Sequence, residues 1–285
     1  MTDVLRYELD PGDPAVQENA LRARDRILAR PDPEPGHTEF GSGMVTDAYL
    51  VGVLGADDRR ACLEKLLCVA EDSGEAATIR QDALAAARNL VIGEESFVKS
   101  TVFRRSQEFV NGQRDGSAHD DLADPPHPLS ALQISIGTAT LRGHGLGLAA
   151  AAADSDAERG WVRGQAVGLL QADEPSLVHK AAVVLSQLPR ASIDDIDADL
   201  LAAHDHFGVR QLSAILSMQH PDRYRRTALR LAEDEDPRVR RTLAEAAART
   251  RTTAPDDVKE VLTVLASDDR YSVRAAALST EERWG

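Results

Sequence analysis

The stretch DEDPRVRRTLAEAAAR, residues 234–249, contains an acidic turn, a proline, a Val-Arg pair and an alanine-rich run. Proline suits the first turn of a helix, where no backbone N–H group is needed. The run that follows places Val239, Leu243 and Ala246 on one face at steps of four and three residues. This pattern predicts an amphipathic helix that buries Val239 and Leu243.

The same motif recurs in SDDRYSVRAAALST, residues 267–280. Five positions recur with an offset of 34 residues: Leu231, Ala232, Asp234, Val239 and Arg240 match Leu265, Ala266, Asp268, Val273 and Arg274. Weaker copies of the Val-Arg pair are Val209-Arg210, Val178-His179 and Ile79-Arg80, and the last four copies are spaced 31, 30 and 34 residues apart. Periods of about 30 to 45 residues with two helices each are typical of an α-solenoid.

An acid in the turn followed by Val-Arg early in the second helix resembles the HEAT-repeat family. Asp234 with Val239-Arg240, and Asp268 with Val273-Arg274, carry this resemblance, which is clearest over residues 155–285 and extends to 57–92. It implies an all-α, right-handed solenoid of about six or seven HEAT-like helix pairs. We expect one domain over residues 1–285, with residues 1–56 as an irregular N-terminal cap.

The resemblance also implies a structural role for the repeated polar residues. An arginine after the turn can form bidentate hydrogen bonds with turn carboxylates of its own and the neighbouring repeat. The residues assigned to this role are Asp234, Arg240, Asp268, Arg274 and Arg210.

Partner-binding candidates lie on the opposite stripe of the second helices, the inner and concave face of such a fold. In the 237–250 helix these are Arg238, Arg241, Glu245 and Arg249. The slot of Arg241 holds Lys180 and Gln211 in earlier repeats, so the face is mixed rather than continuously basic. Trp161 and Arg163 complete the set of partner-binding candidates. A nucleic-acid groove needs a continuous basic track, whereas a mixed face is typical of a protein or peptide site. We therefore expect a non-enzymatic scaffold or adaptor.

Two alternatives stay open. Some HEAT-like proteins are alkylpurine-type DNA glycosylases, and the stretch ERGWVRGQ, residues 158–165, offers Trp161 and Arg163 for such a role. The second alternative is a DNA-mimicking inhibitor, based on the acidic clusters at 154–158, 194–199, 233–236 and 267–269. The same clusters also suit helix starts, where carboxylates meet free N–H groups.

Composition argues against a nucleic-acid partner. The formal net charge is −14 and the sequence pI is about 5.0, and an acidic chain has no general attraction for phosphate. No secretory leader or membrane-spanning run is recognisable, so we expect a cytoplasmic protein. Neither the partner's identity nor the oligomeric state follows from the sequence.

Sequence motifs for chemistry are weak. Cys62 and Cys68 are predicted to be two small buried side chains. The Gly-x-Gly-x-x-Ala stretch 145–150 lacks the acid and second strand of a dinucleotide site, so we expect its glycines to allow close helix packing. His204 and His206 at i, i+2 on a helix do not share a face for one metal. We therefore predict no cofactor, no metal and no catalytic residue.

Local signals give further predictions. Helices are expected near residues 14–29, 59–72 and 75–91. Pro175, Pro221, Pro237 and Pro255 mark expected helix starts, and SIDD at 192–195 has the form of a capping box. Residues 112–127 are predicted to be an exposed loop that contacts the same partner.

Overall fold

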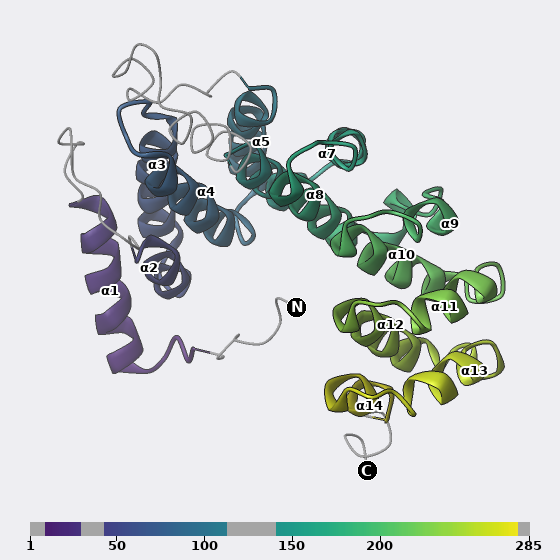
Figure 1. Ribbon diagram of the computed structural model, residues 1–285. Helices are drawn as coiled ribbons and strands as arrows, with labels where there is room; N and C mark the ends of the chain where they lie inside the picture. Colours follow the sequence, from purple (N-terminus) through teal and green to yellow (C-terminus); the bar gives the residue numbers. More distant parts are fainter. Residues whose placement is uncertain (1–8, 30–42, 113–140, 279–285) are drawn as a thin grey trace. The chain divides into compact units, whose positions relative to one another are not determined.

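The computed structural model describes residues 9–29, 43–112 and 141–278 of the 285-residue chain. Every regular element within these ranges is a helix, and no strand occurs in them (Figure 1). The all-α prediction is therefore confirmed. Apart from Gly112, the predicted 112–127 loop lies outside the described residues.

The chain divides into two compact units, unit 1 from Met1 to Gln165 and unit 2 from Ala166 to Gly285. The boundary falls inside helix α7, Asp156–Leu169. Each unit has its own set of packed helices, and each is described separately below.

Unit 1 begins with four helices that pack on one another. They are α1 (Pro14–Leu28), α2 (Met44–Val51), α3 (Ala56–Glu71) and α4 (Ala77–Val91). α1 contacts α2 and α3, and both α2 and α3 pack against α4. The start of α1 follows the expected chemistry, because Asp13 accepts a hydrogen bond from the N–H of Ala15 (2.8 Å) and Pro14 occupies the first turn. The three helices predicted at 14–29, 59–72 and 75–91 are thus confirmed.

The two cysteines of α3 correct one expectation. Cys62 is buried, and burial, with a smaller contribution from Asp58, raises its thiol pKa to about 11. Cys68 is exposed and donates to the carboxylate of Glu64. The prediction of two buried cysteines is wrong for Cys68, because six residues on a helix turn the second side chain well away from the first.

The predicted close approach of glycine is confirmed in the second half of unit 1. α5 spans Ser96–Val110, and residues 141–152 are also helical. A Cβ atom added to Gly145 would lie 2.6 Å from Cβ of Phe109, far inside van der Waals contact. Gly145 therefore lets its helix approach α5 closely.

α7 starts at a capping box that the sequence analysis missed. Oγ of Ser155 accepts from the N–H of Glu158 (3.2 Å), and Oε2 of Glu158 accepts from the N–H of Ser155 (2.9 Å). The signal was present in the sequence, because Ser155 is followed by an acid three residues later.

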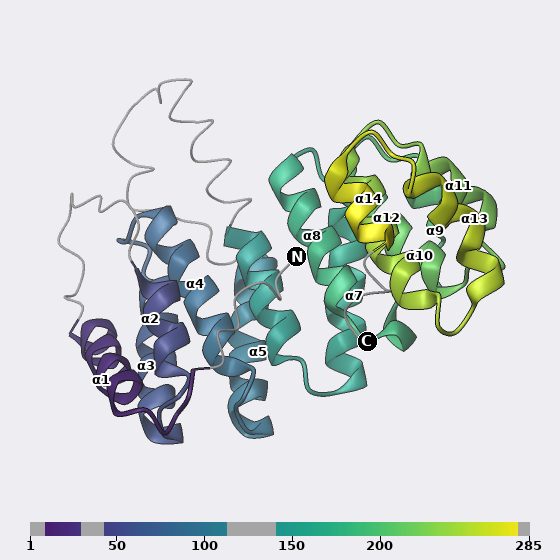
Figure 2. The ribbon, with the colours of Figure 1, turned by 90° about the horizontal axis from the view of Figure 1, so that it is seen from below.

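Unit 2 consists of short helices in alternation. They are α8 (Pro175–Gln187), η1 (Arg190–Ser192), α9 (Ala198–Leu201), α10 (Phe207–Gln219), α11 (Arg225–Ala232), α12 (Pro237–Thr250), α13 (Pro255–Leu265) and α14 (Tyr271–Leu278). α8, α10, α12 and α14 pack in succession, each against the next, while α11 packs on α13. Figures 1 and 2 show α10, α12 and α14 along one side of unit 2 and α9, α11 and α13 along the other.

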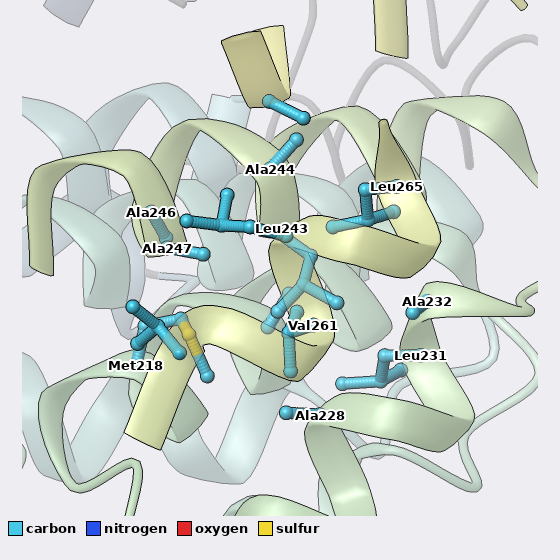
Figure 3. Packing of buried hydrophobic residues seen from close by; sticks show 14 of the residues in the cluster. Met218, Ala228, Leu231, Ala232, Leu243, Ala244, Ala246, Ala247, Val261 and Leu265 are labelled. Atoms are coloured by element: carbon cyan, nitrogen blue, oxygen red, sulfur yellow. The ribbon is translucent and has the colours of Figure 1, made fainter. Parts of the chain in front are cut away.

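The core of unit 2 lies between these two rows. Met218 of α10, Leu231 of α11, Leu243 of α12 and Val261 of α13 point toward one another (Figure 3). Val239 and Leu243 have no exposed surface, as the periodicity of residues 237–250 predicts. Small alanines such as Ala244 and Ala247 fill the spaces between the larger side chains and allow the helices to pack closely.

The helix-start signals are confirmed in three of five cases. Pro175, Pro237 and Pro255 each open a helix. Pro221 does not, because a turn follows it and α11 begins only at Arg225. The SIDD capping box is also wrong: Ser192 ends a 3-10 turn, and the next helix is capped by Asp197, which accepts from the N–H of Asp199.

Candidate functional site

The candidate site is the exposed side of α8, α10 and α12, which we name the second-helix face. It comprises the predicted partner-binding residues of unit 2, Lys180, Gln211, Arg238, Arg241, Glu245 and Arg249. On α12 the buried stripe of Val239 and Leu243 leaves the opposite stripe exposed, and Arg238, Arg241 and Arg249 lie on it. The helix period thus separates the core positions from the candidate contact positions.

The arginines of the Val-Arg pairs lie between consecutive turns rather than on this face. Arg240 binds Asp268 of the next repeat in a bidentate manner, through Nε to Oδ2 (2.6 Å) and Nη2 to Oδ1 (3.1 Å). Arg210 binds Asp234 in the same way, at 2.8 and 3.0 Å. These pairs connect α10 to the turn before α12, and α12 to the turn before α14.

One detail of the predicted pairing needs correction. Each arginine was expected to reach a carboxylate of its own turn, but it donates to backbone carbonyl oxygens there. Nη1 of Arg240 donates to the carbonyl of Asp234 (2.7 Å), and Nη1 of Arg274 donates to that of Asp268 (2.6 Å). The reason is geometric, since the carboxylate of the turn is already engaged by the preceding repeat's arginine.

Electrostatics follow from these contacts. Burial opposes ionisation of Asp268, but hydrogen bonds from Arg240 and from the N–H of Arg270 outweigh it, so the pKa of Asp268 is lowered. The hydrogen bond to Asp268 is also the main reason why the pKa of Arg240 is raised. The pair is therefore ionised throughout the neutral range.

Arg238 is the most constrained residue of the second-helix face. Its guanidinium lies over the ring of Phe207, 3.5 Å from the ring centroid, and Nη2 donates to Oδ2 of Asp236 at 2.6 Å. Asp236 is also the N-cap of α12 and accepts from the N–H of Arg238. Arg238 is exposed, yet it fixes the start of α12 as well as presenting a charge.

The remaining cations of α12 are freer. Arg241 forms an i,i+4 ion pair with Glu245 (2.8 Å), and both side chains are more than one third exposed. Arg249 is exposed, and its guanidinium forms no ion pair within the described part of the chain. An exposed i,i+4 pair stabilises a helix only slightly, so both arginines remain accessible to a partner.

Gln211 and Lys180 extend the face to α10 and α8. Nε2 of Gln211 donates to Oγ1 of Thr242 (2.8 Å) and to the carbonyl of Arg238 (3.2 Å), which ties α10 to α12. Gln211 and Lys180 are both half-buried. Gln211 therefore has a structural role that the sequence analysis did not anticipate.

Trp161 and Arg163 lie on α7 in unit 1. The Trp161 ring makes an edge contact with Phe103, with the centroids 5.5 Å apart and an interplanar angle of 76°. Both Trp161 and Arg163 are half-buried. Trp161 therefore serves the packing of α7 on α5, and the second-helix face is defined without it.

The histidines take an unexpected place. His204 and His206 were treated as helical residues, but they lie in the turn before α10, where His206 is the N-cap. No group of three or more His, Cys, Asp or Glu side chains suited to a metal ion is found among the described residues. The two rings instead accept backbone hydrogen bonds: Nδ1 of His204 from the N–H of His206, and Nδ1 of His206 from the N–H of Gly208, both at 3.0 Å.

Sequence reasoning also missed Phe207, which supports Arg238. The signal is an aromatic residue at the first position of α10, where α8 and α12 have proline. An aromatic residue at the start of one repeat's second helix can place its ring beneath the guanidinium of an arginine at the start of the next repeat's second helix.

Within the described ranges, no helix has both the length and the apolar character needed to cross a membrane. No protein-family model matches the chain, and a comparison with curated proteins finds no match either.

Proposed function

We propose that the helix pairs of this chain form a HEAT-like, right-handed α-solenoid, and that the protein is a non-enzymatic adaptor. In this proposal a protein or peptide partner binds to the second-helix face. The observation that carries it is the exposure of Arg238, Arg241 and Arg249 along one stripe of α12, opposite the stripe that packs the core.

Repeated polar contacts support the solenoid part of the proposal. The pairs Arg210–Asp234 and Arg240–Asp268 join equivalent positions of successive repeats in unit 2. In unit 1, Arg24 with Asp58 and Arg60 with Glu94 join residues 34 positions apart. An array in which each repeat contacts its neighbours presents the same helix face repeatedly, which is how solenoids build extended binding surfaces.

The charge of the face supports a macromolecular partner with acidic groups. The chain carries a net charge of −14, yet the second-helix face has more positive than negative side chains. Its cations are Lys180, Arg238, Arg241 and Arg249, and its acidic residue is Glu245. A locally cationic stripe on an acidic protein repels nucleic acid at long range but can pair with individual carboxylates at close range. An acidic segment of a partner protein fits this arrangement.

Site-specific photo-crosslinking tests the proposal. A photoreactive amino acid at Arg249 or Arg241 is expected to capture one defined partner in native extract. The matched control places the same group at Arg226 or Arg230, which are also exposed arginines but belong to α11 in the other row. Capture from the α11 positions alone would contradict the proposed face.

Two triple charge-reversal variants, one on the face and one around α11, make the test quantitative. Lys180→Glu, Arg241→Glu and Arg249→Glu change three cations on the face, while Arg223→Glu, Arg226→Glu and Arg230→Glu change three cations around α11. Arg238 is left intact because it stabilises the start of α12. Only the first variant is expected to weaken binding of the captured partner, by at least about tenfold, since three removed ion pairs exceed about 1.4 kcal/mol together.

A mobility-shift assay with duplex DNA separates this proposal from the glycosylase alternative. At about 50 mM salt, phosphate contacts are strong enough for a genuine DNA-binding protein to shift the duplex. We expect no shift. A shift that disappears in the Lys180, Arg241 and Arg249 variant would assign the face to nucleic acid instead.

The crosslinking experiment also tests the DNA-mimicking alternative. Capture of a basic DNA-binding protein through the acidic turns would favour the DNA-mimicking inhibitor.

A further inference from the structure

The junction between α8 and α10 departs from the other junctions of unit 2. The Val-Arg slot holds Arg210, Arg240 and Arg274 in the later repeats, but His179 in this one. In the turn, six residues before Arg240 and Arg274, the chain has Asp234 and Asp268, but six residues before Arg210 it has His204. The positions that form an Arg–Asp pair at the next two junctions of unit 2 are therefore both histidine at the α8–α10 junction, namely His179 and His204.

The backbone of this turn is nevertheless built like the others. Nη1 of Arg210 donates to the carbonyl of His204 (3.1 Å), as Nη1 of Arg240 does to that of Asp234. His204 Nδ1 accepts from the N–H two residues later at 3.0 Å, where Asp234 Oδ1 does so at 2.9 Å. The imidazole therefore replaces a carboxylate oxygen as the acceptor.

The N-cap shows the same replacement. Nδ1 of His206 accepts from the N–H of Gly208 at 3.0 Å, just as Oδ1 of Asp236 accepts from the N–H of Arg238 at 2.9 Å. A carboxyl group can still accept a hydrogen bond when it is protonated, whereas an imidazolium has N–H groups on both nitrogens and no acceptor. Each of these histidines can hold its turn only while it is neutral.

The two nitrogens of His204 are both committed. Nε2 lies 3.2 Å from the carbonyl oxygen of Leu170, so it is the donor, and Nδ1 is the acceptor for the N–H of His206. A proton added at Nδ1 would face that N–H group directly. The hydrogen bond that shapes the turn would then become a repulsive contact.

His179 adds to the effect from α8. Its ring centroid lies 5.8 Å from that of His206 and 5.6 Å from that of Phe207. Its Nδ1 is buried without a hydrogen-bond partner, and a Cβ atom on Gly208 would lie only 2.8 Å from it. A charged ring at this position would be poorly solvated.

Most other charges around the cluster are positive or already paired. Lys180 on α8, Arg210 on α10 and Arg238 on α12 surround the rings. The carboxylates of Asp234, Glu235 and Asp236 are engaged by those two arginines, and Asp205 lies between the two turn histidines in the sequence. Burial first, and then Lys180 and Arg238, lower the pKa of His179. Burial first, and then the neighbouring histidines and the two arginines, lower the pKa of His206.

We propose that the α8–α10 junction is a pH-sensitive hinge within unit 2. It stays closed while the rings of His179 and His206 are neutral and Nδ1 of His204 accepts its backbone hydrogen bond, and it opens when His179 and His206 take up protons in mildly acidic solution. The junctions held by Arg210–Asp234 and Arg240–Asp268 stay closed over the same range, because each is held by a bidentate arginine–carboxylate contact and contains no histidine. The hinge separates Lys180 from Gln211, so its opening changes the spacing of the second-helix face.

Amide hydrogen exchange of the full chain, followed residue by residue by NMR, tests the hinge without any partner. Protection factors refer each exchange rate to an unstructured amide at the same pH, which removes the intrinsic pH effect. The amides of His206 and Gly208 are expected to lose protection by about tenfold per pH unit for each proton taken up below about pH 6.5. The equivalent amides of Asp236 and Arg238 serve as the control within the same molecule and are expected to keep theirs to about pH 5.

A variant that restores the ordinary junction completes the experiment. The variant H179R/H204D/H206D gives this junction the side chains of the next one, where Arg210, Asp234 and Asp236 occupy the corresponding positions. Its Gly208 amide is expected to stay protected to about pH 5. Equal pH dependence of Gly208 and Arg238 in the unaltered protein would overturn the hinge, and so would equal loss in the restored variant. If that variant does not fold, the comparison of Gly208 with Arg238 decides alone.

Discussion

At the scale of single residues, the repeated Arg–Asp pair is a structural contact. The side chains of Arg240 and Asp268 are 12% and 6% exposed, and both ends of the guanidinium are occupied. A buried ion pair contributes little compared with a well-packed apolar pair, but breaking it leaves one charge without compensation. Truncation of either Arg240 or Asp268 should therefore destabilise the protein.

Asp268→Ala tests this point. We expect the free energy of unfolding to fall by about 2 to 4 kcal/mol, because Arg240 then keeps a largely buried charge without its bidentate acceptor. Denaturant titration measures the change. Glu260→Ala is the control, since Glu260 pairs with Arg225 and both side chains are at least half exposed; it should leave stability almost unchanged, and equal losses would contradict the structural reading.

Gly145 is the second residue whose role is steric. Gly145→Ala is expected to cost about 1 to 3 kcal/mol, because its Cβ atom would lie 2.6 Å from Cβ of Phe109 and the helix would have to move away from α5. The matched change is Gly160→Ala in α7, where nothing lies within 4 Å of the new Cβ. That variant should be stabilised by up to about 1 kcal/mol through helix propensity. Thermal unfolding of the two variants shows whether the signs differ.

At the scale of helices, α12 illustrates how one element divides its residues between core and surface. Leu243 is fully buried in the cluster shared by α10 to α14, and Arg241 and Arg249 lie on the outside. Leu243→Ala is expected to lower the free energy of unfolding by about 2 to 5 kcal/mol, since neighbouring helices can close the cavity only in part.

Val264→Ala in α13 controls for a general effect of shortening an aliphatic side chain. Val264 is 37% exposed, so its loss should cost less than about 1 kcal/mol. Chemical denaturation of both variants provides the comparison. A Leu243→Ala cost as small as that of Val264→Ala would mean that α12 does not pack as described.

At the scale of the whole molecule, pH dependence distinguishes the two kinds of junction. The pKa values of His179 and His206 are lowered in the folded protein, so the unfolded chain binds more protons than the folded one below about pH 6.5. Their contribution to stability is complete above about pH 6.5 and is lost as pH falls through the lowered values. Asp236 and Asp268, also with lowered pKa values, lose theirs only below about pH 4.

Equilibrium denaturation from about pH 8 to about pH 3 should therefore show two separate decreases in the free energy of unfolding. H179R/H204D/H206D is expected to remove the first decrease and keep the second. A single decrease below about pH 4 in the unaltered protein would show that the histidines do not contribute.

Much of the architecture was readable from the sequence because it rests on local periodicity. The steps of three and four residues predicted the helices α3, α4 and α12, and the position of Val239 and Leu243 in the core followed from the same period. Helix starts were less reliable. Pro221 and Ser192 carry the right side chains, but the following residues form turns that bring other groups to the cap.

The candidate site was predictable only as a stripe on a helix. The sequence alone determined that Arg238, Arg241 and Arg249 share the exposed side of α12, because the helix period fixes that. Only the tertiary structure showed that Phe207 lies beneath Arg238, that Gln211 binds Thr242, and that the ring of His204 accepts a backbone hydrogen bond in the turn before α10. These contacts join side chains from different helices, and their geometry is set by how the helices pack rather than by spacing along the chain.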